Sequence, residues 1–431
     1  MMSQSKLKRV IGKFGIAALA INGLIGAGIF ALPAGAAAQT GNFSPWAFLI
    51  CAVLMLLIVL CFAQLAMGFD HTGGPVAYAK RAFGDHIAFQ TTWLLYIGRL
   101  TALAANTNAI VLYLSFFYDG FAQGFLHSFS IIFVLITLLW LNLRNAAQTM
   151  SIINIITAIK LLPLVLFVLL GFTYIDLDKV VAFNLDEVEN LSGALLLLVY
   201  AYIGFEGAVI PAGESKEPKK MIAKALISTL LITAILYFCI QVVSISVLDN
   251  VAISSAPLAD SAQVMVGSIG AAIIGIAAIV SISGNLSAIV FTAPRMTFAL
   301  ARQGNLPKWF ASISEKTKTP QNSIIFLVVF AMILALTGSF IWLAIISSLA
   351  RLIGYFITIS ALVKLKKELI QSQTQWILPL GLLIPLLALC VCLWLASAAS
   401  WQSWLTTMAF CCCGSGLFWL TRPKTKNKKV E

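Results

Sequence analysis

Charged residues are scarce in this chain of 431 residues, where they make up only 10% of the sequence. Soluble globular domains carry about 25% charged residues, and this chain is also 60% hydrophobic. The composition excludes a soluble globular domain and predicts an integral membrane protein. The apolar segments are continuous and lack the alternation of a membrane β-barrel, so we expect an all-α protein.

Motifs of enzymes and metal sites are missing as well. The phosphate-binding pattern GxxxxGK[ST] does not occur, which argues against an ATP-driven pump. HExxH and GxSxG are also absent, so hydrolase chemistry is not expected. The eight cysteines fall inside apolar segments and form neither a disulfide framework nor, with the three histidines, a metal-binding pattern. We therefore predict that the protein is not an enzyme and uses no metal or cofactor.

The long apolar segments predict how often the chain crosses the membrane. A bilayer core requires roughly 20 apolar residues per helix, and by this measure the chain has about twelve candidate spans. Only short polar connections separate them, which predicts a single membrane domain. The approximate centres of the spans are Gly26, Leu56, Ala102, Leu135, Leu164, Gly204, Ile235, Ile279, Val329, Gly354, Leu387 and Phe410.

Basic residues occur in every second connection between the spans. They include Lys80, Arg81, Arg144, Lys216, Lys219, Lys220, Lys224, Arg302, Lys308, Lys364, Lys366, Lys367 and the tail. The intervening connections are mainly acidic, with Asp119, Asp176, Asp178, Asp186, Glu187, Glu189, Asp249 and Asp260. This positive-inside pattern places both termini in the cytoplasm, with the protein in the plasma membrane or, in a prokaryote, the inner membrane. The net charge of +12 therefore reflects topology and does not indicate nucleic-acid binding.

Charged residues remain at membrane depth once the connections are assigned. They are Arg99, Lys160, Glu206 and Arg351. A charge in the membrane interior is costly, so each is a candidate functional residue. The alternative is an internal ion pair that fixes helix packing.

Glycine and proline interrupt the first and sixth spans. The first break is in INGLIGAGIFALPAG, with Gly23, Gly26, Gly28 and Pro33, and the second is in YAYIGFEGAVIPAGES, with Gly204, Gly207 and Pro211 around Glu206. Interrupted helices at corresponding positions of two halves are typical of inverted-repeat secondary transporters. A half-helix N-terminus attracts a carboxylate and free carbonyls attract an ammonium, so the breaks suit an amino acid. Close packing of small residues is the alternative explanation.

These segments resemble the amino acid/polyamine/organocation (APC) permease family. GLIGAGIFALPAG is similar to the first-span motif of the family, and TGGPVAYAKRAFG to its second-loop motif. YIGFEGAVIPAGESKEP resembles the sixth span with its exit loop, and RMTFALARQGNLPKWF the segment after span eight. The resemblance extends from about residue 11 to 367, while spans eleven and twelve are generic apolar helices.

The resemblance implies a LeuT-like fold of five plus five inverted-repeat spans, with discontinuous spans 1 and 6 and two additional helices. The implied segments are a cytoplasmic N-terminus (1–13), a first repeat (14–174), a second repeat (191–367), spans 11 and 12 (376–420) and a basic cytoplasmic tail (421–431). It implies a permease that moves an amino acid by alternating access. A channel, or a non-transporting amino-acid receptor with the same fold, stays open as an alternative.

The resemblance also implies a binding site. The backbone of Leu24, Ala27 and Gly28 would bind the substrate's carboxylate and amine, with help from the Ile203 carbonyl. Tyr200 matches an aromatic gate, and Gly98 and Arg99 fall where the family has small pocket residues. Arg99 departs from that pattern, and a cation there disfavours cationic substrates, so we expect a neutral or broad-range amino acid.

Lys160 and Glu206 are the candidates for energy coupling. Glu206 matches an acidic residue proposed as a pH sensor in the family. Lys160 matches a lysine that occupies the sodium position in some proton-coupled members, and Ser281 and Ser283 are its expected hydroxyl neighbours. The resemblance therefore implies proton coupling or exchange, while a permanently charged, purely structural Lys160 is the alternative. The oligomeric state, monomer or dimer, is left open.

Overall fold

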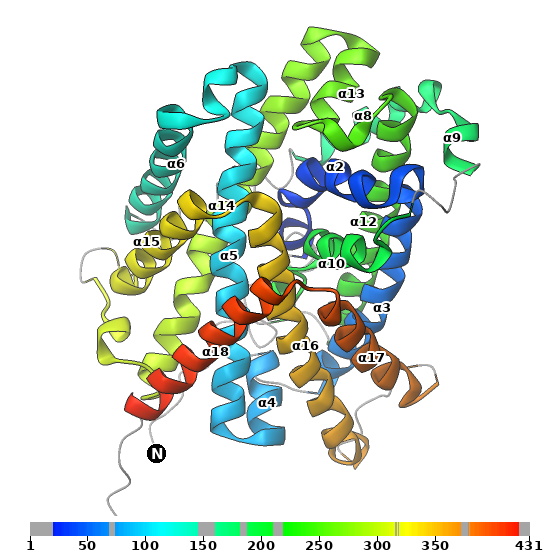
Figure 1. The fold of residues 1–431 in the computed structure, drawn as a ribbon. Coiled ribbons are helices and arrows are strands. Elements are labelled where there is room, and N and C mark those ends of the chain that lie inside the picture. The colour runs from blue at the N-terminus through cyan, green and yellow to red at the C-terminus, as the bar shows by residue number, and fades with distance from the viewer. Residues whose placement is uncertain are drawn as a thin grey trace, which may run out of the picture.

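The computed structural model describes residues 20–68, 74–144, 160–181, 188–209, 219–314, 317, 319–371, 378 and 380–421. Within these residues the chain is helical and has no strand (Figure 1). The helices that precede residue 190 are α2 (Gly28–Thr40), η1 (Gly41–Phe43), α3 (Ser44–Gly68), α4 (Pro75–Phe83), α5 (Asp85–Phe117), η2 (Asp119–Phe121), α6 (Gly124–Arg144), α8 (Leu161–Gly171), η3 (Phe172–Tyr174) and α9 (Leu177–Val181). Those that follow are α10 (Leu191–Tyr202), α11 (Glu206–Val209), α12 (Lys219–Val247), η6 (Val251–Ile253), α13 (Pro257–Val266), α14 (Ser268–Arg302), η7 (Lys308–Ala311), α15 (Gln321–Thr337), α16 (Phe340–Gln371), α17 (Leu383–Ser397) and α18 (Trp401–Thr421).

Several of these segments can cross a bilayer by length and composition. In the described part of the chain there are 7 of them, at Gly28–Gly68, Asp85–Phe117, Gly124–Leu143, Met221–Val247, Ser268–Arg302, Phe340–Gln371 and Trp401–Thr421. The first contains both α2 and α3. Shorter apolar helices lie at Leu161–Tyr174, Leu191–Tyr202, Gln321–Thr337 and Leu383–Ser397. A multi-pass membrane protein is thereby supported, and the number of twelve spans stays a prediction.

The predicted span centres fall on helices, with two exceptions. Gly26 and Gly204 lie in non-helical residues, at 25–27 and 203–205. Both positions are those where the glycine pattern predicts a break. The predicted N-terminal segment 1–13, Pro211 and all but the first residue of the tail 421–431 lie outside the described residues.

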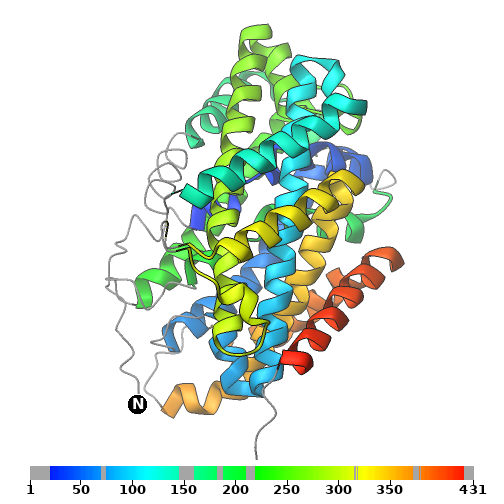
Figure 2. The ribbon, with the colours of Figure 1, turned by 90° about the vertical axis from the view of Figure 1, so that its left-hand side faces the viewer.

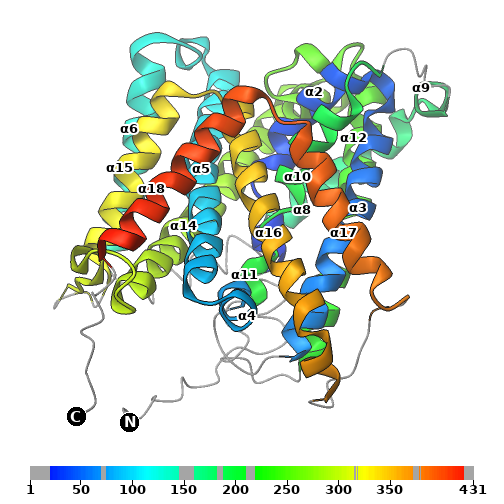
Figure 3. The ribbon, with the colours of Figure 1, turned by 60° about the horizontal axis from the view of Figure 1, so that its bottom comes forward.

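Long helices at the centre of the bundle carry the shorter, interrupted ones. α5 packs along α16 and α14, while α12 packs along α3 (Figures 1 and 3). The short helix α10 contacts α2, α3 and α16, which places its C-terminal end inside the bundle. α6 and α15 lie side by side on the outside (Figure 2). On α6, Phe125, Phe129 and Phe133 are exposed, as expected for a surface that faces lipid rather than water.

Basic and acidic connections lie at opposite ends of the bundle. α4, which carries Lys80 and Arg81, lies at the lower end in Figure 1, next to the C-terminal end of α16. A surface ion pair joins Arg81 to Glu368 of α16, at 3.1 Å. The helices α9 and α13, which carry Asp178 and Asp260, lie at the upper end. The alternating charge pattern of the sequence therefore corresponds to two ends of one molecule.

Candidate functional site

Two interrupted helices meet at the centre of the molecule. Residues 20–24 form a short helical piece, the chain bends through residues 25–27, and α2 then begins at Gly28. In the second break, α10 ends at Tyr202 and α11 begins at Glu206. The N-terminus of α2 has no side chain that caps it and no acidic residue in its first turn. Its first amide groups are therefore available to a ligand, because the first N–H groups of a helix have no partner within it.

Glycines let the two breaks touch through their backbones. A Cβ atom on Gly23 would lie 2.5 Å from the Gly204 oxygen, and one on Gly204 would lie 2.3 Å from the Gly23 oxygen. Gly204 also has φ of +106°, a conformation that L-residues rarely adopt. A Cβ on Gly28 would lie 2.8 Å from Cα of Ala201 in α10. No residue other than glycine fits at these contacts without a shift of the backbone.

The glycines therefore serve both to interrupt the helices and to allow close backbone packing. The sequence pattern presented these two roles as alternatives. Among the glycines at the predicted breaks, Gly26 and Gly204 lie in the non-helical segments. Gly23 and Gly207 lie in helical turns, so the interpretation of these two as points of unwinding is wrong. Gly23 is required for close approach of the second break, and a Cβ on Gly207 would face the Arg99 guanidinium at 3.5 Å.

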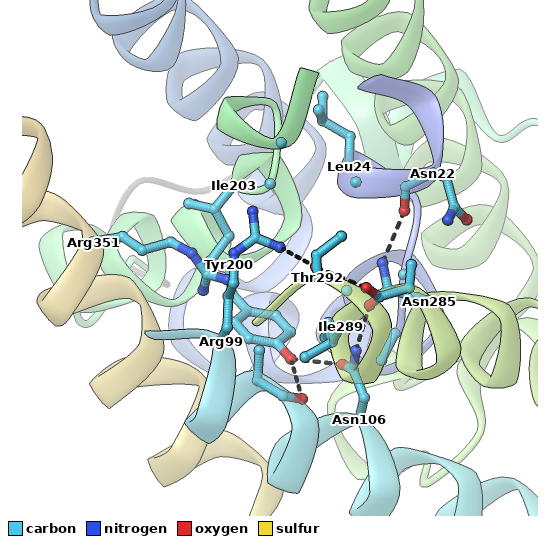
Figure 4. A pocket seen from close by; sticks show the side chains of 18 of the residues that line it. Asn22, Leu24, Arg99, Asn106, Tyr200, Ile203, Asn285, Ile289, Thr292 and Arg351 are labelled. Carbon is cyan, nitrogen blue, oxygen red and sulfur yellow. Dashed lines mark hydrogen bonds between the residues drawn. The ribbon is translucent and has the colours of Figure 1, made fainter. Parts of the chain in front are cut away.

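A cavity lies between the two breaks (Figure 4). The cavity has a volume of ≈ 90 Å³. That is several times the roughly 10–15 Å³ that a single water requires, and so leaves room for a small ligand. Its lining comprises Asn22, Gly23, Leu24, Gly26, Ala27, Gly28, Arg99, Ala102, Asn106, Tyr200, Ile203, Gly204, Gly207, Asn285, Ala288, Ile289, Phe291, Thr292 and Arg351.

Most of the predicted substrate-binding residues line this cavity. They are Leu24, Ala27, Gly28, Arg99, Tyr200 and Ile203. Gly98 is not part of the lining, and its carbonyl accepts hydrogen bonds from Ser347 and Arg351 of α16. A Cβ at position 98 would lie 2.9 Å from Cγ of Arg351. Gly98 is thus a packing position for Arg351, since the glycine leaves space for that arginine.

A chain of hydrogen bonds leads from the cavity wall to Lys160 (Figure 4 shows the first part). Tyr200 donates to Oδ1 of Asn106 at 2.6 Å, and Asn106 donates to Oδ1 of Asn285 at 2.9 Å. Asn285 donates to the backbone oxygen of Asn22 at 2.8 Å. Lys160 donates to Oδ1 of Asn22 at 2.6 Å. This chain joins α10, α5, α14, the helical piece before the first break, and the residue that precedes α8.

Lys160 is held by the first break itself. Its side chain is buried, and it also donates to the carbonyl of Ile25 at 2.6 Å. The expected partners Ser281 and Ser283 accept no hydrogen bond from it, which corrects that expectation. The Ser281 hydroxyl is buried and has no hydrogen-bond partner in the described part of the chain. The side-chain oxygen of Asn22 and the carbonyl oxygen of Ile25 bind the Lys160 ammonium in place of the serine hydroxyls, because both residues lie at the break.

Glu206 is surrounded by donors. One oxygen accepts from the Gly204 amide at 2.9 Å and from the Tyr355 hydroxyl at 2.8 Å. The other accepts from Arg351 Nε at 3.3 Å and lies 3.7 Å from Arg99 Nη2. Glu206, Arg99 and Arg351 thus form the kind of internal ion pairing that was the alternative to a functional role, whereas Lys160 takes no part in it.

The asparagines of this site were not among the sequence-predicted residues. Asn22, Asn106 and Asn285 are nearly buried and mutually hydrogen-bonded. A signal was present, because polar amides in apolar spans must find partners and are therefore conspicuous. Charge does not distinguish them, because the asparagine side chain is neutral.

Comparison with known proteins fits this geometry. A sequence profile described as "Amino acid permease" matches residues 11–420. The chain belongs to the amino acid permease family. It is therefore a transporter of multi-pass membrane type and not an enzyme, in agreement with the prediction.

Three curated relatives of this permease come from Bacillus subtilis (strain 168). A methylthioribose transporter is 24% identical over 97% of this chain and 94% of the relative. A branched-chain amino acid permease, BcaP, is 25% identical over 97% of this chain and 94% of the relative. A serine/threonine exchanger, SteT, is 27% identical over 89% of each chain. The substrates in their names differ although their similarity to this permease is nearly equal.

Proposed function

We propose that this permease is a secondary active transporter that carries a neutral or broad-range amino acid across the plasma membrane by alternating access. One observation supports this most strongly: two broken helices touch through glycines beside a cavity at which the uncapped N-terminus of α2 begins. A carboxylate fits that terminus because the aligned peptide dipoles favour negative charge there. The carbonyl groups around Ile203 fit an ammonium, and Tyr200, which packs edge-on against Phe340 at 5.9 Å, serves as the aromatic gate.

The orientation follows from the charged ends of the bundle. The basic end, with α4 and the end of α16, faces the cytoplasm together with both termini. The spans follow a LeuT-like arrangement of five plus five inverted repeats, with α2 and α10 at the breaks and α17 and α18 outside the repeats.

Protons supply the coupling, or the permease exchanges one amino acid for another. Lys160 supports this because an ammonium at the first break takes the place of a metal cation and can also lose its proton. The site gives sodium no favourable position next to that charge. Glu206 is weaker support for proton coupling, because its oxygens already accept hydrogen bonds from Gly204, Tyr355 and Arg351.

Transport by the purified permease in liposomes tests the proposal. We expect saturable uptake of labelled amino acids, accelerated by unlabelled amino acid inside and driven by an imposed pH gradient without sodium. A pore would give flux that does not saturate, and a receptor would bind an amino acid without flux. Either result would overturn the proposal.

A further inference from the structure

The wall of the cavity carries two arginines and, among the described lining residues, neither aspartate nor glutamate. Glu206, next to this wall, supplies one negative charge for Arg99 and Arg351 together. Of the two arginines, Arg351 donates a hydrogen bond to Glu206, whereas Arg99 Nη2 lies 3.7 Å from the carboxylate without a hydrogen bond. The wall is therefore left with one positive charge in excess, and Arg99 carries it.

The guanidinium of Arg99 is only partly satisfied. It makes one hydrogen bond, from Nη1 to the Thr292 hydroxyl at 3.2 Å (Figure 4). Nε and Nη2 are buried and have no hydrogen-bond partner in the described part of the chain. The side chain is 9% exposed, so water does not replace these partners freely. A buried donor without a partner carries a large desolvation penalty, and a buried charge carries a larger one.

A ligand group that accepts hydrogen bonds and carries negative charge removes both penalties. Nε and Nη2 are enclosed, and Nη2 faces Glu206 at 3.7 Å, so a ligand reaches them when the Arg99 side chain turns toward the cavity. The two nitrogens lie side by side on the guanidinium and then match the two oxygens of a carboxylate. The α-carboxylate of an amino acid is accommodated by the N-terminus of α2, at Ala27 and Gly28, on a different element. A second carboxylate, on the side chain of the substrate, is then the group that fits Arg99.

We infer that Arg99 is the specificity-determining residue of the cavity and that the permease prefers amino acids with an acidic side chain, such as aspartate and glutamate. The inference rests on the proposed function and changes its substrate class, from a neutral or broad-range amino acid to one with an acidic side chain, because a neutral side chain leaves the excess charge in place. Arg351 does not compete for this role, since Glu206, Gly98 and Ser347 already accept its hydrogen bonds.

Binding by the full-length permease in detergent tests the inference. L-Aspartate and L-glutamate are compared with asparagine and glutamine, which have nearly the same shape without the charge, and with leucine as an apolar reference. Competition against a labelled amino acid gives the affinity of each. We expect the acids to bind at least tenfold more tightly than their amides.

Two variants locate the effect. Arg99→Gln removes the charge, and we expect the ratio of acid to amide affinity to fall to about one or below. Arg99→Lys keeps the charge without the planar fork, and we expect it to keep a reduced preference for the acids. The ratio in the unchanged protein decides the matter even where Arg99→Gln does not fold.

The outcomes separate this inference from the proposed function. Equal binding of glutamate and glutamine to the unchanged permease would assign Arg99 to the α-carboxylate or to structure and overturn the inference alone. An equal loss of affinity for all amino acids in a folded Arg99→Gln protein would overturn it as well. If no amino acid binds at all, the proposed function falls, and the inference falls with it.

Discussion

Lys160 Nζ lies 2.6 Å from the carbonyl oxygen of Ile25, the first residue of the break that precedes α2. A second bond of the same length joins it to the side chain of Asn22. Both partners lie on the first interrupted helix, whereas Lys160 directly precedes α8. Protonation of one side chain is thereby tied to the geometry of the break, because loss of the proton removes the charge that strengthens both hydrogen bonds.

Replacement of Lys160 by alanine therefore separates coupling from binding. We expect Lys160→Ala to exchange labelled for unlabelled amino acid across liposomes and to lose uptake driven by an imposed pH gradient. A purely structural lysine predicts a different outcome, in which both activities fall together. Uptake by the unchanged permease that needs sodium and ignores the pH gradient would contradict proton coupling.

Substitution of Gly28 by valine is expected to abolish amino acid binding. Its Cβ would lie 2.8 Å from the backbone of Ala201, so α2 must move away from α10 at the ligand position. The control is Gly416→Val, because a Cβ at Gly416 meets nothing within 4 Å. Equilibrium binding to both purified variants measures the effect. Unchanged affinity in Gly28→Val would move the site elsewhere.

Loss of the Glu206 charge is expected to destabilise the fold. Glu206→Gln leaves Arg99 and Arg351 buried together without a counter-charge, and loss of one partner of a buried pair costs about 3–5 kcal/mol. Glu368→Gln is the matched control, because it breaks only the exposed pair with Arg81, a kind worth about 0–1 kcal/mol. Thermal unfolding in detergent compares the two. Equal melting temperatures would show that Glu206 is not held mainly by the arginines.

The asparagine chain is expected to act as a unit. Asn285→Ala removes the acceptor of Asn106 and the donor to Asn22, and a buried group left unpaired costs about 1–3 kcal/mol. The variants Asn285→Ala and Tyr200→Phe should therefore be non-additive in a double-mutant cycle on thermal stability. Asn322→Ala serves as the control, because the Asn322 amide donates to the Trp309 carbonyl at an exposed position. Additive losses would contradict a connected chain.

Composition and hydropathy were sufficient for the helical class and for placing most of the predicted span centres on helices. Each apolar run must satisfy its own backbone inside lipid, so helices follow from local sequence alone. The breaks at Gly26 and Gly204 could also be predicted, since glycine and proline act locally on the helix that contains them.

Contacts between distant segments could not be predicted in the same way. Gly23 and Gly204 are far apart in the sequence, and nothing local to Gly23 shows that another backbone packs on it. The partners of Lys160 were expected to be the serines of span eight, whereas they are Asn22 and Ile25. The contact at Gly23 and the partners of Lys160 were missed for the same reason. The side on which a helical residue meets its neighbour depends on how several helices pack together.

The contact between Gly23 and Gly204 also restricts how the chain can evolve. An enlarged residue in a protein core is commonly tolerated when its neighbour becomes smaller, but here both neighbours already lack a side chain. No second substitution at the partner position can restore the fit, because glycine is the smallest residue available. Suppressors of a change at either position must therefore arise in residues that shift a whole half-helix. A selection for revertants of Gly23→Ala would accordingly identify the residues on which the two breaks pivot.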